Sequence, residues 1–420
     1  MVERRIPIAV QEAVNKVMEH RITGEREKVS ILNCNNRRLA EKISAKHNIP
    51  SFDKSPYDGF AVRSEDTQNA SSDNPVEFEV VEHIGAGQLP TKTLKVNQAT
   101  RIMTGAKIPS GADCVAMFEV CQTSDRNNKQ YMSLKRKMAA GQNIIKEGSE
   151  VKNGELLLPE GTIINPGVKA ILATFGYNQV EVARKPVIGV LATGTELLEV
   201  DQELVPGKIR NSNAYMIASQ IEQAGGICKY YGKLADEFDP SYKKIKDVLE
   251  EVDILITTGG VSVGDFDLMP DIYAELEAEV LFNKVAMRPG SVTTVAVKGN
   301  QLLFGLSGNP SACYVGFELF VRPVIQHYLF NNNPYLKRIK ATLAADFPKP
   351  NPFTRFVRSY ITYENGMVNV QLAGMDKSNV VTSLAHTTCF MVLPGGTRGF
   401  KSGDQVEALL LNDPIGQGEF

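Results

Sequence analysis

Three apolar runs decide the fold: PVIGVLA (Pro186–Ala192), VDILITT (Val252–Thr258) and QLLFGL (Gln301–Leu306). Each run leads into a turn that carries glycine, namely TGTEL, GGVSVGDFD and SGNPSA. Amphipathic segments such as NAYMIASQIEQAGG separate the runs. Near-continuous apolar strands that alternate with amphipathic helices are typical of a parallel sheet covered on both faces. We therefore predict an α/β domain over residues 184–330, with its ligand site at the carboxyl ends of the strands.

The rest of the chain predicts three further domains. Apolar spacing between Pro7 and Ala45 favours two helices, and INPGVKAILATFGYNQVEV favours a proline-capped helix followed by an edge strand. Together they predict a discontinuous helical domain over residues 1–50 and 145–183. Short β runs joined by Gly, Pro and Asn predict an inserted β domain over 51–144. Similar runs after the linker FNNNPY predict a small C-terminal β barrel or sandwich over 335–420. The expected fold class is multidomain α/β and β.

Composition excludes several classes of protein. The 420 residues are enough for about three domains. A net charge of −2 argues against a protein that grips nucleic acid or anionic lipid. No apolar run approaches the roughly 18 to 20 residues of a membrane helix, and the first residues, MVERRIPIAV, lack the apolar core of a secretion signal. We expect no nucleic-acid partner and no membrane association.

Cysteine and histidine usage, together with missing motifs, excludes further kinds of site. The six cysteines include no CxxC pair, so we expect reduced thiols and a cytoplasmic protein. The five histidines are scattered singly, which excludes HExxH-type zinc centres. The sequence also lacks GxxxxGK[ST] and GxGxxG, so ATP hydrolysis and NAD chemistry of the usual kinds have no support.

Glycines in the three turns predict an anion site. Gly194, Gly259, Gly260, Gly264 and Gly308 place bare backbone N–H groups at expected helix starts, where hydrogen bonding and the helix dipole favour phosphate or other oxyanions. A single glycine turn is more often only a tight turn. Three turns that converge on one sheet edge favour anion binding instead.

Acidic side chains stand at the same edge. Glu196, Asp236, Asp265 and Asp267 would repel a phosphorylated ligand unless a divalent cation lay between them. Oxygen ligands without His or Cys favour Mg²⁺. Each carboxylate alone is more often a helix cap or a solvated surface group. Asp267 closes the GGVSVGDFD loop opposite the glycines and is the strongest metal candidate of the set.

Basic residues and two further motifs add candidates. Lys284 and Arg288 lie four residues apart before a Pro-Gly turn that we expect at the sheet edge, where they would neutralise substrate oxyanions or, alternatively, remain solvated. Asp58 lies between an aromatic residue and a glycine in SPYDGFA. Thr104, in RIMTGAKIPSGADCVAMFE, offers a hydroxyl to an oxyanion, although the motif alone could be a simple β turn.

Five motifs in this order and at these separations carry a family resemblance. SPYDGFA, RIMTGAKIPSGADCVAMFE, ATGTEL, TTGGVSVGDFD and GLSGNPSA closely resemble the molybdopterin molybdenumtransferases, which include the bacterial MoeA proteins and the gephyrin E domain. The resemblance covers nearly the whole chain. ATGTEL and TTGGVSVGD would also fit the molybdopterin adenylyltransferase of the same pathway, whereas SPYDGFA and RIMTGA favour the first family.

The resemblance implies a four-domain, elongated homodimer with its active site between the α/β domain of one subunit and the β domain of the other. The implied reaction inserts molybdate into the dithiolene of adenylated molybdopterin and releases AMP, and the adenylyltransferase would supply that substrate. It implies functional roles for Asp58, Thr104, Glu196, Asp236, Asp267, Lys284 and Arg288, with Mg²⁺ held by Glu196, Asp236 and Asp267. The implied cofactor-binding residues are Gly194, Thr195, Gly259, Gly260, Ser262, Gly264, Asp265, Ser307, Gly308, Asn309 and Pro310.

The sequence also departs from the family pattern. The usual TGDEL reads TGTEL, KPGKP reads RPGSV from Arg288, and GLPGNP reads GLSGNP with Ser307. Arginine in place of lysine keeps the charge but changes the geometry, and Ser291 removes a cation. These changes motivate two rival hypotheses, a non-catalytic molybdopterin carrier or scaffold and an enzyme that transfers adenylyl from ATP.

Overall fold

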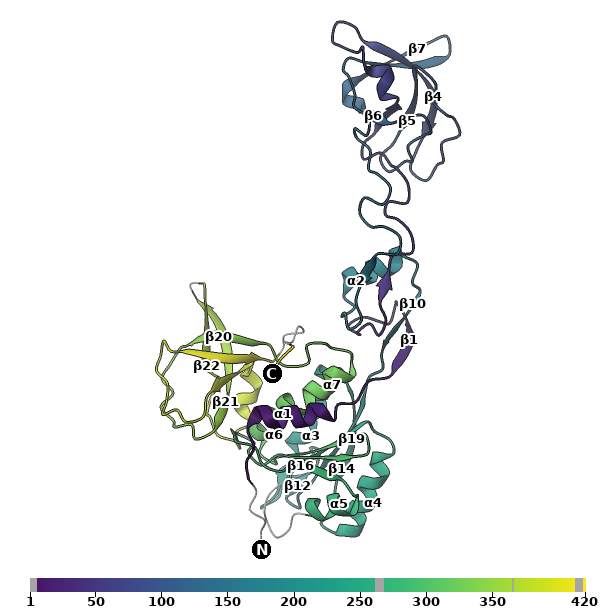
Figure 1. Cartoon of the computed structure of the whole chain (residues 1–420). Helices are drawn as coiled ribbons and strands as arrows, with labels where there is room; N and C mark the ends of the chain where they lie inside the picture. Colours follow the sequence, from purple (N-terminus) through teal and green to yellow (C-terminus); the bar gives the residue numbers. More distant parts are fainter. Residues whose placement is uncertain (1–5, 261–267, 365, 412–417) are drawn as a thin grey trace. The chain divides into compact units, whose positions relative to one another are not determined.

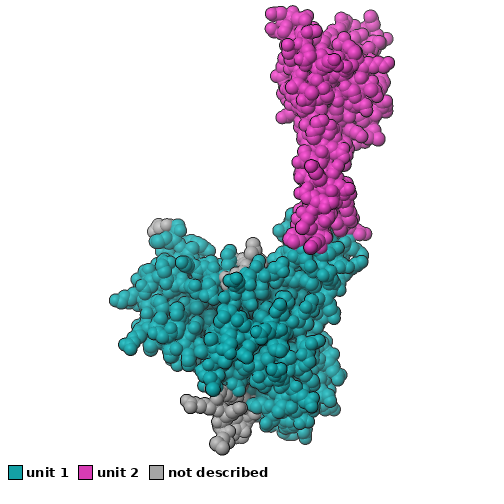
Figure 2. All heavy atoms as spheres, in the orientation of Figure 1, with its two compact units in different colours: residues 1–41, 160–168, 179–420 teal, residues 42–159, 169–178 magenta. Residues whose placement is uncertain are grey.

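The computed structural model describes residues 6–260, 268–364, 366–411 and 418–420. The chain forms two compact units, shown in different colours in Figure 2. Unit 1 consists of Met1–Glu41, Glu160–Val168 and Gln179–Phe420, and unit 2 consists of Lys42–Pro159 and Lys169–Asn178. Unit 1 holds the α/β domain and the C-terminal barrel, whereas unit 2 holds the inserted β domain.

A six-stranded sheet forms the centre of the α/β domain. Three of its pairings, which join four neighbouring strands, are parallel and the other two are antiparallel, so the predicted parallel sheet is confirmed for four strands and the whole sheet is mixed. The strand order is β14 (Ile227–Lys233), β11 (Val187–Ala192), β15 (Ile254–Thr258), β19 (Gln301–Leu306), β18 (Thr294–Lys298) and β16 (Glu279–Phe282).

Helices cover both faces of this sheet, as the apolar runs predicted (Figure 1). Within β15, Ile254 and Ile256 face one helical layer and Leu255 faces the other, because successive side chains of a strand point to opposite faces. The first layer contains α1 (Val10–Glu19), α3 (Ser212–Gln223), α6 (Pro310–Gly316), the π-helical turn Phe317–Val321 and α7 (Arg322–Tyr328); the second contains α4 (Phe238–Leu249) and α5 (Met269–Glu275).

The second helix predicted before residue 45 is wrong. Strand β1 (Arg26–Ser30) pairs with β10 (Gln179–Ala183), and the chain that follows is irregular. Leu39 N–H donates to the carbonyl of Thr162 and Ala40 N–H to that of Glu181, so distant segments take the backbone bonds that a helix would have used. Leu39 and Ile43 are buried without forming a helix, whereas Leu32 is exposed. Helix α2 (Pro166–Thr174) begins at the predicted proline.

Unit 2 contains the predicted β domain. Its strands form a second six-stranded sheet, with separate apolar clusters on its two faces. The order is β6 (Cys114–Met117), β3 (Gly59–Val62), β5 (Gln98–Ile102), β4 (Val76–Ile84), β8 (Lys129–Leu134) and β7 (Cys121–Arg126). A short ribbon of β2 (Ile43–Ser44) and β9 (Leu156–Leu158) belongs to the same unit, as do the 3₁₀ turns Ser64–Thr67 and Phe118–Val120.

The C-terminal region is a closed barrel and not a sandwich, because its first and last strands pair with each other. The ring runs β21 (Thr354–Glu364), β22 (Met367–Leu372), β20 (Arg338–Leu343), β24 (Gln405–Leu410) and β23 (Cys389–Leu393). Strand β17 (Met287–Arg288), from the α/β part of the sequence, joins this sheet beside β21. The barrel and the α/β domain are therefore linked through the pairing of β17 with β21.

Two further observations concern the predicted class of protein. Within the described ranges, no helix is long and apolar enough to cross a membrane. All six cysteines are free thiols, and four of them are buried. The expectation that most of the thiols are buried is thus confirmed.

Candidate functional site

The three glycine turns meet at one edge of the α/β sheet. Thr193 N–H donates to the Thr258 carbonyl at 2.9 Å, and Gly259 N–H donates to the Leu306 carbonyl at 2.9 Å. A Cβ added to Gly308 would lie 3.7 Å from the Gly259 Cα. The carboxyl ends of β11, β15 and β19 are therefore in contact, as the strand pattern predicted. We call the turns that follow them, which carry Gly194, Gly259, Gly260 and Gly308, the strand-end cluster.

Glu196 depends on the glycine two residues before it. Gly194 has φ +134°, and a Cβ at this position would lie 2.6 Å from Glu196 Oε2. Any side chain here would push the carboxylate away from the turn, since real Cβ contacts are never this short. The backbone conformation thus favours glycine at position 194, and a larger residue there would also move the exposed Glu196 carboxylate out of its present place.

The prediction that each glycine turn opens a helix is wrong for Gly194. The chain instead enters the short parallel pair β12 (Leu197–Leu198) and β13 (Ile209–Arg210), and α3 starts only after Asn211, whose side chain accepts the Ala214 N–H at 3.2 Å. The next described helix after Gly259 and Gly260 is α5, which begins at Met269, nine residues after Gly260. Gly308 lies two residues before α6, which begins at Pro310.

Side chains from β14 fasten the segment that carries Glu196. Lys233 Nζ donates to the Leu197 carbonyl at 2.6 Å, and Tyr230 Oη donates to Glu199 Oε1 at 2.9 Å. Burial raises the pKa of Tyr230, with Glu199 adding to the effect, so the phenol stays protonated and keeps this bond. The Thr195 carbonyl accepts from Lys208 Nζ at 2.7 Å. Glu196 is exposed but its backbone is held at both sides.

Asp236 follows the end of β14, the strand beside β11, at the same edge of the α/β sheet. Leu234 N–H donates to the Ala192 carbonyl at 2.8 Å, which joins the end of β14 to the end of β11. Glu196 and Asp236 therefore follow two adjacent parallel strands, and both are exposed. The remaining predicted residues of the neighbouring loop, Ser262, Gly264, Asp265 and Asp267, lie outside the described residues.

The described carboxylates fit part of a magnesium site. No group of three or more His, Cys, Asp or Glu side chains in the described part of the chain could hold a metal. Glu196 and Asp236 offer only oxygen donors, and the Gly194 cradle keeps space for the Glu196 carboxylate. This donor chemistry suits a hard divalent cation. The complete set of three ligands stays a prediction, since Asp267 is its third member.

The Ser307–Pro310 turn is held by α3 and by the barrel. Asn213, in the first turn of α3, donates from Nδ2 to the Gly308 carbonyl at 2.8 Å, and its buried Oδ1 has no partner. Ser307 Oγ accepts the Asn309 N–H at 3.2 Å. Ser311 N–H donates to Ser378 O at 3.0 Å, so one N–H at the start of α6 is already used. Sequence reasoning missed Asn213, because an Asn in the first turn of a helix is common.

The expectation that the basic residues lie at the edge of the α/β sheet is wrong for Arg288, whereas Lys284 lies two residues after the end of β16, an edge strand of that sheet. Arg288 is on β17, opposite Arg355 of the barrel, and is exposed. The buried Met287 joins a core that includes Phe356, which explains why this segment follows the barrel. Lys284 is half-buried. A Cβ at Gly290 would lie 3.2 Å from a carbonyl of α6, so the Pro-Gly turn nevertheless borders the strand-end cluster.

In unit 2, Asp58 and Thr104 form one hydrogen-bonded pair. Asp58 Oδ1 accepts from Thr104 N at 2.7 Å and from Thr104 Oγ1 at 2.9 Å. The backbone bond and then the hydroxyl bond lower the pKa of Asp58. An exposed carboxylate with a lowered pKa stays ionised, so it suits the binding of hydrogen-bond donors better than the carrying of a proton.

Packing around this pair explains the residues beside it. A Cβ on Gly59 would lie 2.2 Å from the Ala116 carbonyl, so only glycine lets β3 and β6 approach there. Phe118 N–H donates to the Asp58 carbonyl at 3.2 Å, and the Arg101 guanidinium lies 4.9 Å from the Phe118 ring centre. The buried Nε of Arg101 has no hydrogen-bond partner. Arg101 belongs to the RIMTGA motif, but nothing in the sequence indicates its contact with Phe118 beside the Asp58 turn.

Replacing Thr104 with valine is expected to raise the pKa of Asp58 only part of the way to its ordinary value. The substitution removes the hydroxyl bond but keeps the backbone N–H bond, which is the larger cause of the lowered pKa. A ¹³C NMR titration of the carboxyl groups measures this. Asp53, whose pKa is lowered by Lys146 and Glu147, serves as the control and should not move. An unchanged Asp58 pKa would contradict the assigned bond.

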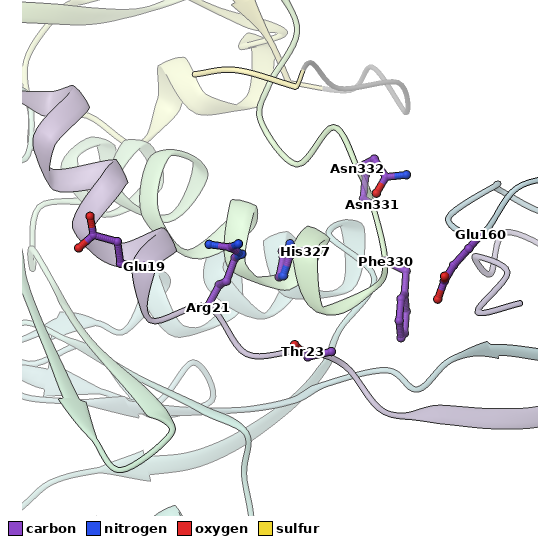
Figure 3. A pocket seen from close by; sticks show the side chains of 8 residues that line it. All are labelled: Glu19, Arg21, Thr23, Glu160, His327, Phe330, Asn331 and Asn332. Atoms are coloured by element: carbon purple, nitrogen blue, oxygen red, sulfur yellow. The ribbon is translucent and has the colours of Figure 1, made fainter.

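A cavity of about 610 Å³ lies elsewhere in unit 1. It opens between the end of α1 and the end of α7, where Arg21 approaches His327 (Figure 3). Burial lowers the pKa of His327, and Arg21 adds to the effect. None of the predicted site residues lines this cavity, whose walls are Glu19, Arg21, Thr23, Glu160, His327, Phe330, Asn331 and Asn332.

Three family models match successive parts of the chain. The MoeA N-terminal region (domain I and II) matches residues 8–176, and a probable molybdopterin binding domain matches 189–327. The MoeA C-terminal region (domain IV) matches residues 340–411. The second model covers the strand-end cluster, and the first covers the Asp58–Thr104 pair.

Similar proteins cover nearly the whole chain. The molybdopterin molybdenumtransferase of Bacillus subtilis (strain 168) is 56% identical over 416 residues, which are 99% of this chain and 97% of that protein. The enzyme of the same name from Staphylococcus epidermidis is 50% identical, with 97% of each chain covered. A crystal structure of the molybdopterin biosynthesis MoeA protein from Pyrococcus horikoshii has a TM-score of 0.85 at 28% identity and covers 97% of this chain and 100% of that one.

Proposed function

Because the chain belongs to the MoeA family of molybdopterin molybdenumtransferases, we propose that it inserts molybdate into adenylated molybdopterin and releases AMP and the molybdenum cofactor. The observation that carries the proposal is the convergence of three glycine turns at one sheet edge, with Glu196 and Asp236 in the segments that follow two adjacent strands there. A molybdopterin adenylyltransferase is the proposed supplier of the substrate.

In and around the strand-end cluster, backbone and basic groups are proposed to bind phosphate, and carboxylates are proposed to bind the metal ion. Backbone groups at the Gly194, Gly259 and Gly308 turns, with Lys284 and Arg288 nearby, would hold the phosphate groups of the substrate. Glu196, Asp236 and Asp267 would hold Mg²⁺, which when bound neutralises phosphate and molybdate charge. The carboxylates alone would repel these anions.

The thiols of the protein are unsuitable nucleophiles for this reaction. Burial raises the pKa of Cys114 to about 12, of Cys121 and Cys228 to about 11, and of Cys389 to about 12. The thiolate is the reactive form, and very little of it exists in these groups near neutral pH. We infer that the two dithiolene sulfurs of the substrate bind molybdenum themselves.

We further propose that the protein works as a homodimer in which unit 2 of one copy serves unit 1 of the other. The Asp58–Thr104 pair belongs to unit 2 and the strand-end cluster to unit 1. Asp58, kept ionised by Thr104, would accept hydrogen bonds from the pterin N–H groups. Family resemblance supports this arrangement.

Release of AMP tests the proposed function. Purified protein is incubated with adenylated molybdopterin, with and without molybdate and Mg²⁺, and AMP is quantified by chromatography. We expect AMP release that requires both additions. Tight binding of the substrate without AMP release would favour the carrier hypothesis, and ATP consumption without molybdate would favour adenylyl transfer. Either result would contradict the proposal.

A further inference from the structure

The C-terminal barrel contacts two of the predicted site segments. Strand β17 places Arg288 opposite Arg355 of β21. The loop after β22 reaches α6, where Ser311 N–H donates to the Ser378 carbonyl at 3.0 Å and Ser311 Oγ donates to the Val380 carbonyl at 2.6 Å. Ser311 is fully buried and follows the Ser307–Pro310 turn directly. The barrel therefore touches Ser311, the residue after the turn, through residues 378 and 380, and it touches the basic segment through β17.

A carboxylate surrounded by three cations anchors this loop. Asp376 Oδ2 lies 2.9 Å from Arg355 Nη1 and 3.2 Å from Lys349 Nζ, and Asp376 Oδ1 lies 3.9 Å from Arg358 Nη2. The Asp376 side chain is only 6% exposed. Charges taken out of water at such a site interact more strongly than surface pairs, and removing one partner leaves the others uncompensated.

Arg358 sets the path of the same loop. Its Nη2 donates to the carbonyl groups on both sides of Asp376, those of Met375 at 3.0 Å and Lys377 at 3.1 Å. Its Nε donates to Ser383 Oγ at 3.1 Å. Residues 375–383 are thus tied to β21 at several points, while residues 378 and 380 are tied to α6. A displacement of Asp376 would reach Ser311 through only two intervening residues.

We propose that Asp376 is a positioning residue for the substrate site. With Arg355 it fixes the loop 375–380 against Ser311, and thereby fixes the Ser307–Pro310 turn beside Arg288. Arg355 serves both sides of this connection, since its side chain holds Asp376 and its backbone lies in register with Arg288. The inference rests on the proposed function, because it assigns the turn and Arg288 to substrate binding.

Asp376→Asn tests the proposal, since asparagine keeps the shape and removes the charge. We expect the KM for adenylated molybdopterin to rise about tenfold while kcat changes less than threefold. We also expect the Ser311 amide to exchange its hydrogen at least tenfold faster. Glu407→Gln is the matched control, because it removes the carboxylate of the Arg338–Glu407 pair elsewhere in the barrel and should leave both readouts unchanged.

Ser311→Ala provides a second, milder variant should Asp376→Asn fail to fold. It removes only the hydroxyl bond to Val380 and should raise the KM in the same direction. An unchanged KM in the folded variants would overturn the proposal. This holds even if the Ser311 amide exchanges faster, because the network would then stabilise the fold without affecting substrate binding. An inactive wild-type protein would contradict the proposed function and not the positioning role. In that case, unchanged exchange of the Ser311 amide in the Asp376→Asn variant would still contradict the positioning role.

Discussion

Replacing Asp58 with alanine is expected to lower kcat/KM for adenylated molybdopterin about 100-fold. A hydrogen bond to a charged group contributes roughly 1.5 to 3 kcal/mol, and the substitution also removes the acceptor that orients Thr104. The Asp58 side chain is exposed, so the melting temperature should stay close to that of the wild type. Steady-state AMP release and a thermal scan measure both.

Asp53→Ala is the matched control for this prediction. Asp53 also fastens a loop of unit 2, through Lys146 Nζ at 2.8 Å and Glu147 N–H at 2.8 Å, but it has no proposed contact with substrate. It should keep turnover within about twofold of the wild type. Equal losses in the two variants would show that loop distortion, and not a substrate contact of Asp58, explains the effect.

Replacing Glu196 with alanine is expected to lower turnover at least about 100-fold when Mg²⁺ is limiting. Loss of groups that only support a metal ligand already costs 10- to 100-fold in affinity or activity, and loss of a ligand should cost no less. Raising the Mg²⁺ concentration should restore part of the rate. The measurement is AMP release as a function of Mg²⁺ concentration.

Glu203→Ala is the control for Glu196, because Glu203 is an exposed carboxylate nearby in the sequence, in the loop between β12 and β13. Its removal should leave the Mg²⁺ dependence unchanged. A Glu196 variant with the wild-type Mg²⁺ dependence would remove Glu196 from the metal site. Gly194→Ala should resemble Glu196→Ala in direction, since its Cβ would displace the same carboxylate.

Local pattern was sufficient to predict the strand-end cluster. The runs around Ile188, Leu255 and Leu303 are apolar on both faces, which only a sheet covered on both sides explains. Parallel strands end at one edge, so the gathering of the turns that carry Gly259 and Gly308 could be predicted without knowing the strand order, and the structure brings these two glycines together. The Asp58–Thr104 bond was not predicted as such, although both residues were candidates.

Features that depend on distant backbone pairing were missed. Leu39 satisfies its N–H on Thr162, more than a hundred residues later, and the spacing of apolar residues before it cannot reveal such a partner. Strand β17 contains two residues and exists because β21 lies beside it, so Arg288 could not be assigned to the barrel from its own neighbours. Loop contacts such as those of Asp376 leave no periodic signal at all.

Mixed dimers test the central claim most directly, that Asp58 of one copy serves Glu196 of the other. Asp58→Ala and Glu196→Ala proteins carrying different affinity tags are refolded together, and the mixed dimer is isolated through both tags. Each variant alone should be nearly inactive. If the two copies share each site, one site of the mixed dimer has both substitutions and the other has none, so we predict about half of the wild-type rate of AMP release per dimer. A mixed dimer as inactive as either parent would contradict the claim.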